Sequence, residues 1–230
     1  METPPFSPRL DILPPAQKRL WPELAAVPKE FELYGGTALA LQLGHRDSED
    51  FDLFARADFH PEKLQRSVDF LASAKVIRQE LNTLEVMVER GGPVRVSFFG
   101  VPKLRRLRVP HVAPDNGLKV ASLLDLAGTK AAVVQQRAEM KDYLDLDALI
   151  RIGRISLPAA LAAAQLIYGE TFNPQVTLKS LSFFDDGNLH KLGEDVKLRL
   201  VKAARDVDMD NLPSLDLSDR DWSHDLGPEL

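Results

Sequence analysis

Two adjacent glycines, Gly35 and Gly36, constrain the fold of this chain more than any other feature. The apolar run 31–34 before them predicts a short buried strand, and the run 37–43 after them predicts a helix. Glycine at such a junction lets the backbone approach a ligand closely, and the first turn of the helix offers N–H groups without partners. The pair therefore predicts a cradle for a phosphate, the alternative being that it only ends the strand.

Two aspartates follow on the next predicted strand. Residues 50–54 alternate polar and apolar side chains, so Asp50 and Asp52 are expected on one face, with their Cα atoms about 7 Å apart. Mg²⁺ takes oxygen ligands and commonly bridges one or two carboxylates to the phosphates of a substrate. The alternative is a pair of solvated aspartates on an edge strand. The order of glycines, helix and aspartates favours a phosphate cradle beside a metal site.

These residues resemble the first motif of the nucleotidyltransferase superfamily, and most closely that of the AbiEii/AbiGii toxin family of nucleotidyltransferases. The family pattern is Gly-Gly-Thr-Ala-Leu, followed by Arg-x-Ser-x-Asp-hydrophobic-Asp-Leu-Phe. The residues that match it here are Gly35, Gly36, Thr37, Arg46, Ser48, Asp50 and Asp52.

The resemblance implies that the two aspartates hold Mg²⁺ (or Mn²⁺) and take part in catalysis, while the other five residues bind a nucleoside triphosphate. The implied reaction moves a nucleotidyl group to an acceptor, for which the end of a tRNA is one candidate. The resemblance also implies a place in a bacterial toxin–antitoxin or phage-defence system, with a cognate antitoxin as partner.

Charged residues on the core side of two later helices form a second pattern. The helices are expected over 120–137 and 140–152, and a charge on the core side of a helix is costly unless it is paired or metal-bound. The residues concerned are Lys130 and Arg137 on the first helix, and Asp142 and Asp145 on the second. They predict either an internal ion-pair network that pins the two helices, or a charged face that looks onto Asp50 and Asp52 across a cleft.

The stretch from Lys130 to Leu146 also resembles the second signature of the family, Lys-x-x-Ala followed by Arg-x-x-x-Lys-Asp-x-x-Asp-Leu. The resemblance, which covers residues 30–200, implies catalytic roles for Lys130 and Asp142. It implies contacts with the nucleotide for Lys130, Arg137 and Asp145.

One position departs from the superfamily pattern, which often places a third carboxylate on a later strand. The natural place for it is the run 94–99, where Ser97 stands instead. Glu85 and Glu89 on the preceding strand are candidate substitutes, as is an acid from the helical half. The departure keeps open a catalytically inactive module that binds a nucleotide or a partner. A small-molecule nucleotidyltransferase of the antibiotic-modifying type is a further alternative.

The pattern of elements predicts an α+β fold. A strand–helix–strand unit followed by three extended runs between 74 and 99 gives a small mixed sheet with flanking helices, and a C-terminal helical bundle follows. The predicted division is a flexible arm over 1–14, a nucleotidyltransferase core over 15–113, a helical domain over 114–205 that completes the cleft, and an acidic mobile tail over 206–230.

Composition narrows the partners and the compartment. The net charge of −5 argues against a protein that coats nucleic acid through bulk electrostatics. A local run of basic residues predicts either a phosphate-binding patch for an RNA acceptor or a solvated loop. That run consists of Lys103, Arg105, Arg106 and Arg108.

The lack of cysteine excludes disulfides, thiolate catalysis and Cys-ligated zinc, and it fits a reducing cytoplasm. No apolar run approaches the roughly 18 residues that a membrane span needs, and the N-terminus has no signal-peptide pattern. The five histidines have no metal-ligand spacing and are expected at the surface or in loops. We therefore expect a cytoplasmic protein.

Overall fold

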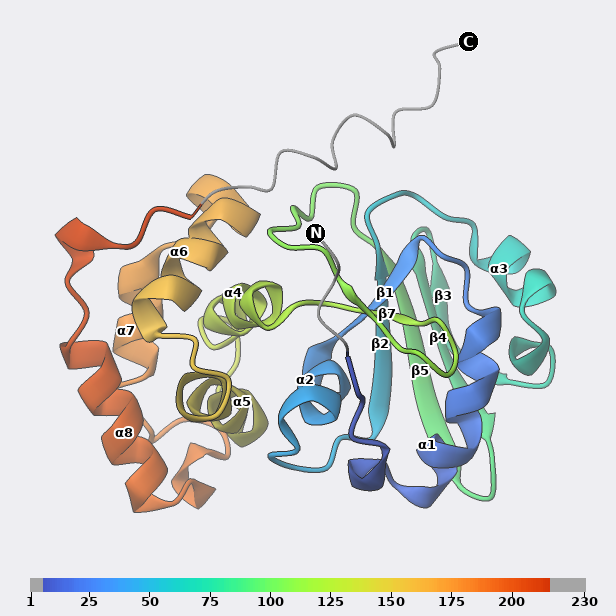
Figure 1. Ribbon diagram of the computed structural model, residues 1–230, viewed down its shortest axis with the longest axis horizontal. Coiled ribbons are helices and arrows are strands. Elements are labelled where there is room, and N and C mark those ends of the chain that lie inside the picture. Colours follow the sequence, from blue (N-terminus) through green and yellow to red (C-terminus); the bar gives the residue numbers. More distant parts are fainter. Residues whose placement is uncertain (1–5, 216–230) are drawn as a thin grey trace, which may run out of the picture.

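A mixed sheet of seven strands forms the centre of the first half of the chain (Figure 1). The computed structural model describes residues 6–215. The order of the strands across the sheet is β3-β4-β5-β2-β1-β7-β6. Their bounds are β1 Phe31–Tyr34, β2 Asp50–Ala55, β3 Lys75–Glu80, β4 Thr83–Glu89, β5 Pro93–Gly100, β6 His111–Val112 and β7 Lys119–Val120.

Strand β2 lies in the middle of the sheet, antiparallel to β1 and parallel to β5. Its side chains alternate as the sequence predicts, with Phe51 and Leu53 buried and the residues between them only partly covered. Trp21 packs near Phe51, with ring centroids 6.3 Å apart. The apolar face of β2 therefore belongs to the core, and the face that carries Asp50 and Asp52 is left for another purpose.

The helices lie on both sides of this sheet. Their bounds are α1 Pro15–Leu20, α2 Gly35–Leu43, α3 Pro61–Ser67, α4 Leu123–Val133, α5 Met140–Arg151, α6 Leu157–Tyr168, α7 Pro174–Ser180 and α8 Glu194–Arg205. Figure 1 shows α4 to α8 gathered on the side away from α1 and α3, with α2 between the sheet and this group. The arrangement confirms the α+β class with a helical C-terminal half. Within residues 6–215, no helix is long and apolar enough to span a bilayer.

Helix α4 is central to the helical half because it packs against α5 and α6 and also contacts α2 beside the sheet. A Cβ at Gly128 would come within 3.0 Å of the backbone of Ala163 and Ala164, so only glycine lets the two helices approach this closely. The helix begins at Leu123, later than the expected 120, because the side chain of Ser122 caps it by accepting a hydrogen bond from the Asp125 N–H.

Residues 6–14, the described part of the predicted flexible arm, are packed against the rest of the protein. The Arg9 N–H donates to the Leu41 carbonyl of α2 at 2.9 Å, and Phe6 stacks on His111. Leu13 is buried. Residues 6–14 therefore lie against the folded body.

Two further predicted boundaries differ from those in the structure. The division at 113/114 falls inside the β6–β7 hairpin, and β7 pairs in parallel with β1, so residues up to 120 belong to the sheet. Of the predicted acidic tail, residues 206–215 include a short 3-10 helix, η6 Met209–Asn211. The remainder, 216–230, lies outside the described residues.

Candidate active site

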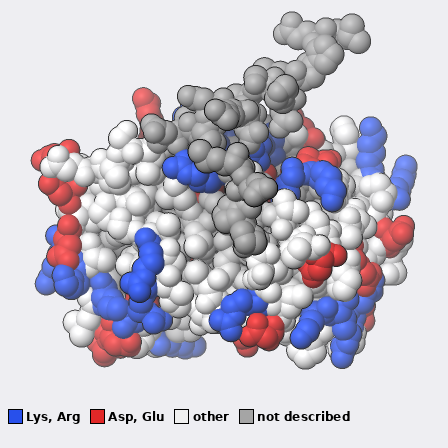
Figure 2. Space-filling model, viewed as in Figure 1, with Lys and Arg blue, Asp and Glu red and all other residues white. Residues whose placement is uncertain are grey.

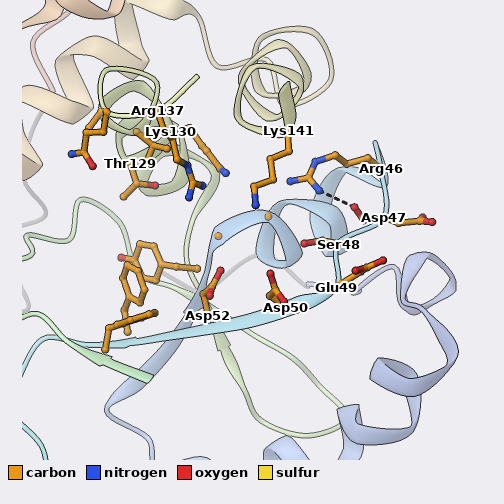
Figure 3. A pocket seen from close by; sticks show the side chains of 18 of the residues that line it. Arg46, Asp47, Ser48, Glu49, Asp50, Asp52, Thr129, Lys130, Arg137 and Lys141 are labelled. Carbon is orange, nitrogen blue, oxygen red and sulfur yellow. Dashed lines mark hydrogen bonds between the residues drawn. The ribbon is translucent and has the colours of Figure 1, made fainter. Parts of the chain in front are cut away.

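A cavity of about 610 Å³ lies between the polar face of the sheet, the start of α2 and the helical half. Such a volume suits a nucleotide-sized ligand. Figure 3 shows Asp50 and Asp52 on β2, with Lys130 and Lys141 across the cavity from them. The charged residues that line it are Arg46, Asp47, Glu49, Asp50, Asp52, Lys130, Arg137 and Lys141.

The two strand aspartates face the cavity as the alternation predicts. Burial, and secondarily the charge of Asp50, raise the pKa of Asp52 to about 6. Lys130 and Lys141 act in the opposite sense without cancelling this rise. Neither aspartate forms an ion pair with a residue in the described part of the chain. The pair is therefore a site of negative charge that the protein itself leaves partly uncompensated.

Gly35 is required directly beneath Asp52. Its φ of +73° is a conformation that side-chain-bearing residues rarely adopt, and an added Cβ would lie 2.5 Å from Oδ2 of Asp52. The sharp turn from β1 into α2 thus brings bare backbone against the carboxylate.

Gly36 is required for a different reason. An added Cβ would lie 2.6 Å from Nη2 of Arg46 and 2.9 Å from Oγ of Ser48. The guanidinium and the hydroxyl thus lie over the first turn of α2, where backbone N–H groups have no helical partner. Gly36, Arg46 and Ser48 line the cavity together, and this is an arrangement that suits an anion.

The sequence predicts that Thr37 contacts the nucleotide, but the structure does not place it where it could do so in the cavity. Its side chain is buried, and its hydroxyl donates to the main-chain carbonyl of Asp50. The residue does not line the cavity. Thr37 instead ties the start of α2 to the start of β2, and so fixes the glycine pair relative to the aspartates.

Lys130 joins the helical half to the cavity. Its Nζ lies 2.7 Å from Oδ1 of Asp142 and 2.6 Å from Oδ2 of Asp145, while its side chain still lines the cavity. Arg137 also lines the cavity and contacts Asp142, with Nε 2.7 Å from Oδ2. The predicted ion-pair network therefore exists, and of its four members the two cations also line the cavity with the strand aspartates.

Asp142 and Asp145 themselves lie behind the cations, fully buried and outside the cavity lining. Burial alone would raise the pKa of Asp142, but the hydrogen bond from Arg137 and the charge of Lys130 lower it below its ordinary value. The predicted catalytic role of Asp142 and the predicted nucleotide contact of Asp145 thus have no direct path to a ligand here. The geometry gives both residues a positioning role.

Asp145 organises three side chains at once. Besides Lys130, it accepts hydrogen bonds from Nε2 of His45 at 2.7 Å and from Nε and Nη2 of Arg46 at 2.7 and 2.9 Å. Burial would raise the pKa of Asp145, but these donors, first of all His45, hold it well below its ordinary value. One buried carboxylate thereby fixes the arginine that lies over Gly36.

His45 and Lys141 are site residues that sequence reasoning missed. The side chain of His45 is 4% exposed, which contradicts its expected place at the surface. Its position directly before Arg46 was the only available signal. Lys141 stands within the second signature, so its motif position could have pointed to it.

Aromatic residues line the cavity as well: Tyr34, Phe54, Phe99 and Tyr168. Phe54 continues the two-residue period of Asp50 and Asp52, which could have revealed it.

Ser97 lies beside Asp52 in the register of β5 against β2, where the superfamily often has an acid. It is buried, and Glu85 pairs with it on the next strand. The carboxylate of Glu85 lies 3.7 Å from Nη1 of Arg78, and that of Glu89 accepts from the Gly92 N–H. Neither glutamate lines the cavity. The described residues thus place no third carboxylate beside Asp50 and Asp52 on this face.

The basic run after β5 is divided by burial. Lys103 and Arg105 are exposed, whereas Arg106 pairs with Glu32 at 2.8 Å in a largely buried position. Arg108 donates to the Leu107 carbonyl. On the face shown in Figure 2, basic and acidic side chains are interspersed. Lys103 and Arg105 therefore remain as the members of the run that present their charge to solvent.

Comparison with known proteins adds independent information. The family model described as "Nucleotidyl transferase AbiEii toxin, Type IV TA system" matches residues 19–225. An uncharacterized protein of Aquifex aeolicus (strain VF5) is 30% identical over 170 residues, which cover 73% of this chain and 80% of that protein.

Two solved structures share the fold. MenT4, a nucleotidyltransferase toxin from Mycobacterium tuberculosis H37Rv, has a TM-score of 0.57 at 17% identity, covering 87% of this chain and 84% of that one. A candidate nucleotidyltransferase from H. pylori has a TM-score of 0.54 at 16% identity, covering 83% of this chain and 90% of that one.

Proposed function

Since the chain belongs to the AbiEii nucleotidyl transferase toxin family, we propose that it transfers a nucleotidyl group from a nucleoside triphosphate to an acceptor, with Mg²⁺ or Mn²⁺ held by Asp50 and Asp52. The observation that carries the proposal is the convergence of two elements distant in sequence. The strand aspartates and the α4 lysine, Lys130, line one cavity.

The donor set suits a hard cation that keeps open positions. Asp50 and Asp52 offer carboxylate oxygens on one face of β2, and the pKa of Asp52 shows that burial beside Asp50 leaves its charge poorly compensated. Among residues 6–215, no group of three or more His, Asp or Glu side chains is arranged to hold a metal. A cation on the two aspartates would therefore take its remaining ligands from water and phosphate, as Mg²⁺ does.

The residues around the cradle supply binding and orientation. Arg46 and Ser48 lie over the first turn of α2, and their donors and the free N–H groups there suit the outer phosphates. Lys130 and Lys141 reach from the opposite wall, where positive charge offsets the charge of the triphosphate. A bound cation would polarise the phosphate that is attacked and neutralise developing charge.

Neither β5 nor α5 offers a free carboxylate beside Asp52 to take the proton from the acceptor, and the other acids that line the cavity, Asp47 and Glu49, lie on the loop before β2. Ser97 occupies the place beside Asp52, and Asp142 and Asp145 are engaged by Lys130. The proposal therefore rests on positioning and charge stabilisation rather than on a dedicated general base. Such terms supply much of the acceleration in phosphoryl-type transfers.

We further propose an RNA acceptor, with the end of a tRNA as one candidate. Lys103 and Arg105 are exposed, and basic side chains make most contacts to nucleic acid backbones. Family membership also supports a cognate antitoxin, a role in a toxin–antitoxin or phage-defence system, and a cytoplasmic location.

Two other functions compete with transfer to RNA. The serine at position 97 favours a module that binds nucleotides without catalysis. A small-molecule nucleotidyltransferase would use the same cavity with a different acceptor. In that case the acidic side chains Asp47 and Glu49, which also line the cavity, would suit a cationic substrate.

A label-transfer experiment separates these functions. The full chain is incubated with Mg²⁺, total bacterial RNA and each nucleoside triphosphate labelled at the α-phosphate. Label in RNA that is lost in Asp52→Ala supports the proposal. Tight nucleotide binding without any transfer supports the inactive module, and label in a small product supports the third function. Loss of transfer on chelation, restored by Mg²⁺, tests the metal.

A further inference from the structure

The cavity is divided by chemistry along β2. Asp50, Asp52 and Phe54 alternate onto the cavity face, with buried residues between them. The charged side chains surround the two aspartates, whereas aromatic side chains line the region beyond them. Two residues along a strand span about 7 Å, so an aromatic ring follows the metal-binding carboxylates by one such step.

These rings form a built platform. The Phe54 ring stacks on the Tyr34 ring, with centroids 5.0 Å apart and planes 13° from parallel. The Phe99 ring meets Phe54 edge-on at 5.3 Å and 90°. Phe54 and Phe99 are neighbours in the β2–β5 register and are only half-buried. Packing against Tyr34 and Phe99 therefore fixes the plane of the Phe54 ring at the cavity wall.

The platform extends from the hydrophobic core to the cavity: Tyr34 is buried and belongs to the core, whereas Phe54 and Phe99 keep exposed surface at the cavity wall. The core on the other face of β2 is filled by Phe51 and Leu53, which are fully buried. The aromatic surface that Phe54 and Phe99 leave open to a charged cavity indicates contact with a ligand that has both a flat apolar part and a charged part.

We propose that Phe54, backed by Tyr34 and Phe99, is the stacking subsite for a nucleobase. The inference rests on the proposed nucleotidyl transfer and specifies its substrate more closely. With phosphates at Asp52 and the α2 cradle, the sugar spans the step along β2 and the base lies over Phe54. Because every base has a π-face, stacking of this kind tolerates all four bases. The platform itself therefore provides affinity rather than base selectivity.

The test compares ligands with and without a base. Binding of α,β-methylene analogues of the four nucleoside triphosphates, and of inorganic triphosphate, is measured with Mg²⁺ by calorimetry. Phe54→Leu keeps apolar volume but removes the π-face. We expect it to weaken binding of every nucleotide analogue roughly 10- to 100-fold and to leave inorganic triphosphate within about twofold. Phe54→Trp should retain nucleotide binding.

A matched control is Phe183→Leu, since Phe183 is 49% exposed and lines a different pocket. It should change the affinity for neither the nucleotide analogues nor inorganic triphosphate. A second arm measures a short oligoribonucleotide in the presence of saturating inorganic triphosphate. If Phe54→Leu weakens binding of the nucleotide analogues but not of the oligonucleotide, the stacked base belongs to the donor. If it weakens binding of the oligonucleotide but not of the analogues, the stacked base belongs to the acceptor.

The outcomes keep the two proposals apart. If wild-type protein binds triphosphate and analogues, but Phe54→Leu binds every ligand as wild type does, the stacking subsite is wrong and the proposed function stands. The subsite is also wrong if Phe54→Leu loses as much affinity for inorganic triphosphate as it loses for the nucleotide analogues. If wild-type protein binds neither triphosphate nor analogues, both proposals fail.

Discussion

Gly35 lies so close beneath Asp52 that a single added methyl group would come within 2.5 Å of the carboxylate oxygen. The turn from β1 into α2 and strand β2 are thus fitted to each other at the level of one atom.

Gly35→Ala should abolish transfer while the protein still folds. The new methyl group displaces the Asp52 carboxylate, and the positive φ adds a strain of about 1 kcal/mol or more. Transfer rates and thermal denaturation measure the two effects. Gly117→Ala is the control, because Gly117 also has a φ of +70° but an added Cβ would meet only the tip of Lys29. It should lose comparable stability and keep its activity, and equal inactivation of both variants would contradict the fit described here.

Asp52→Asn should stabilise the metal-free protein at neutral pH. Because the folded-state pKa of Asp52 is raised to about 6, the ionised form disfavours folding above that pH. This contribution is of the order of 3 kcal/mol, and it vanishes as the pH falls through 6 toward the unfolded value near 4. Urea denaturation of both proteins from pH 4 to 8 measures it.

The same pair of proteins reports on the metal. Mg²⁺ should raise the unfolding midpoint of the wild-type protein and have little effect on Asp52→Asn, which should also lose transfer. A midpoint that responds equally to Mg²⁺ in both proteins would show that the cation binds elsewhere.

Asp145→Asn should impair nucleotide binding although Asp145 does not line the cavity. Loss of its charge leaves Lys130 and Arg46 without their shared partner, which should cost roughly 3 to 5 kcal/mol of stability and raise the KM for the triphosphate. Asp147→Asn is the control on the same helix, since Asp147 pairs with Arg199. That variant should lose some stability with an unchanged KM. Unaltered nucleotide kinetics in a folded Asp145→Asn protein would disprove the positioning role.

The double variant Lys103→Ala/Arg105→Ala should bind the RNA acceptor more weakly and bind the nucleotide as the wild-type protein does. Both side chains are exposed, so the fold should be unaffected. The slope of log affinity against log salt should fall by about 0.7 per lost contact with single-stranded RNA. Arg106→Ala should behave differently, because it removes the 2.8 Å partner of the buried Glu32 and so lowers stability. An unchanged salt slope in the double variant would exclude this run as the RNA contact.

The local parts of the site could be predicted from sequence because they depend on local rules. The alternation around Asp52 places the carboxylate on the open face of β2, and the glycine pair marks the turn into α2. The helical periodicity also marked Lys130 as a charge on the core side of α4. Each of these inferences needs only the chain within one or two turns of the residue concerned.

The remainder depends on contacts between distant segments. Helical azimuth indicates that Asp142 and Asp145 face inward, but not that cations stand between them and the cavity. His45 could not be distinguished from a surface histidine, because its partner is 100 positions away. The docking of Arg9 on α2 likewise has no signature in the sequence of residues 6–14.

The bond between Arg46 and Asp145 joins positions 99 apart in the chain. A nascent polypeptide that ends before α5 would already contain the glycine pair and both strand aspartates, but its arginine would have no anchor. On the proposed function, the capacity to hold a triphosphate would arise only late in synthesis, when the helical half has left the ribosome and folded onto the sheet.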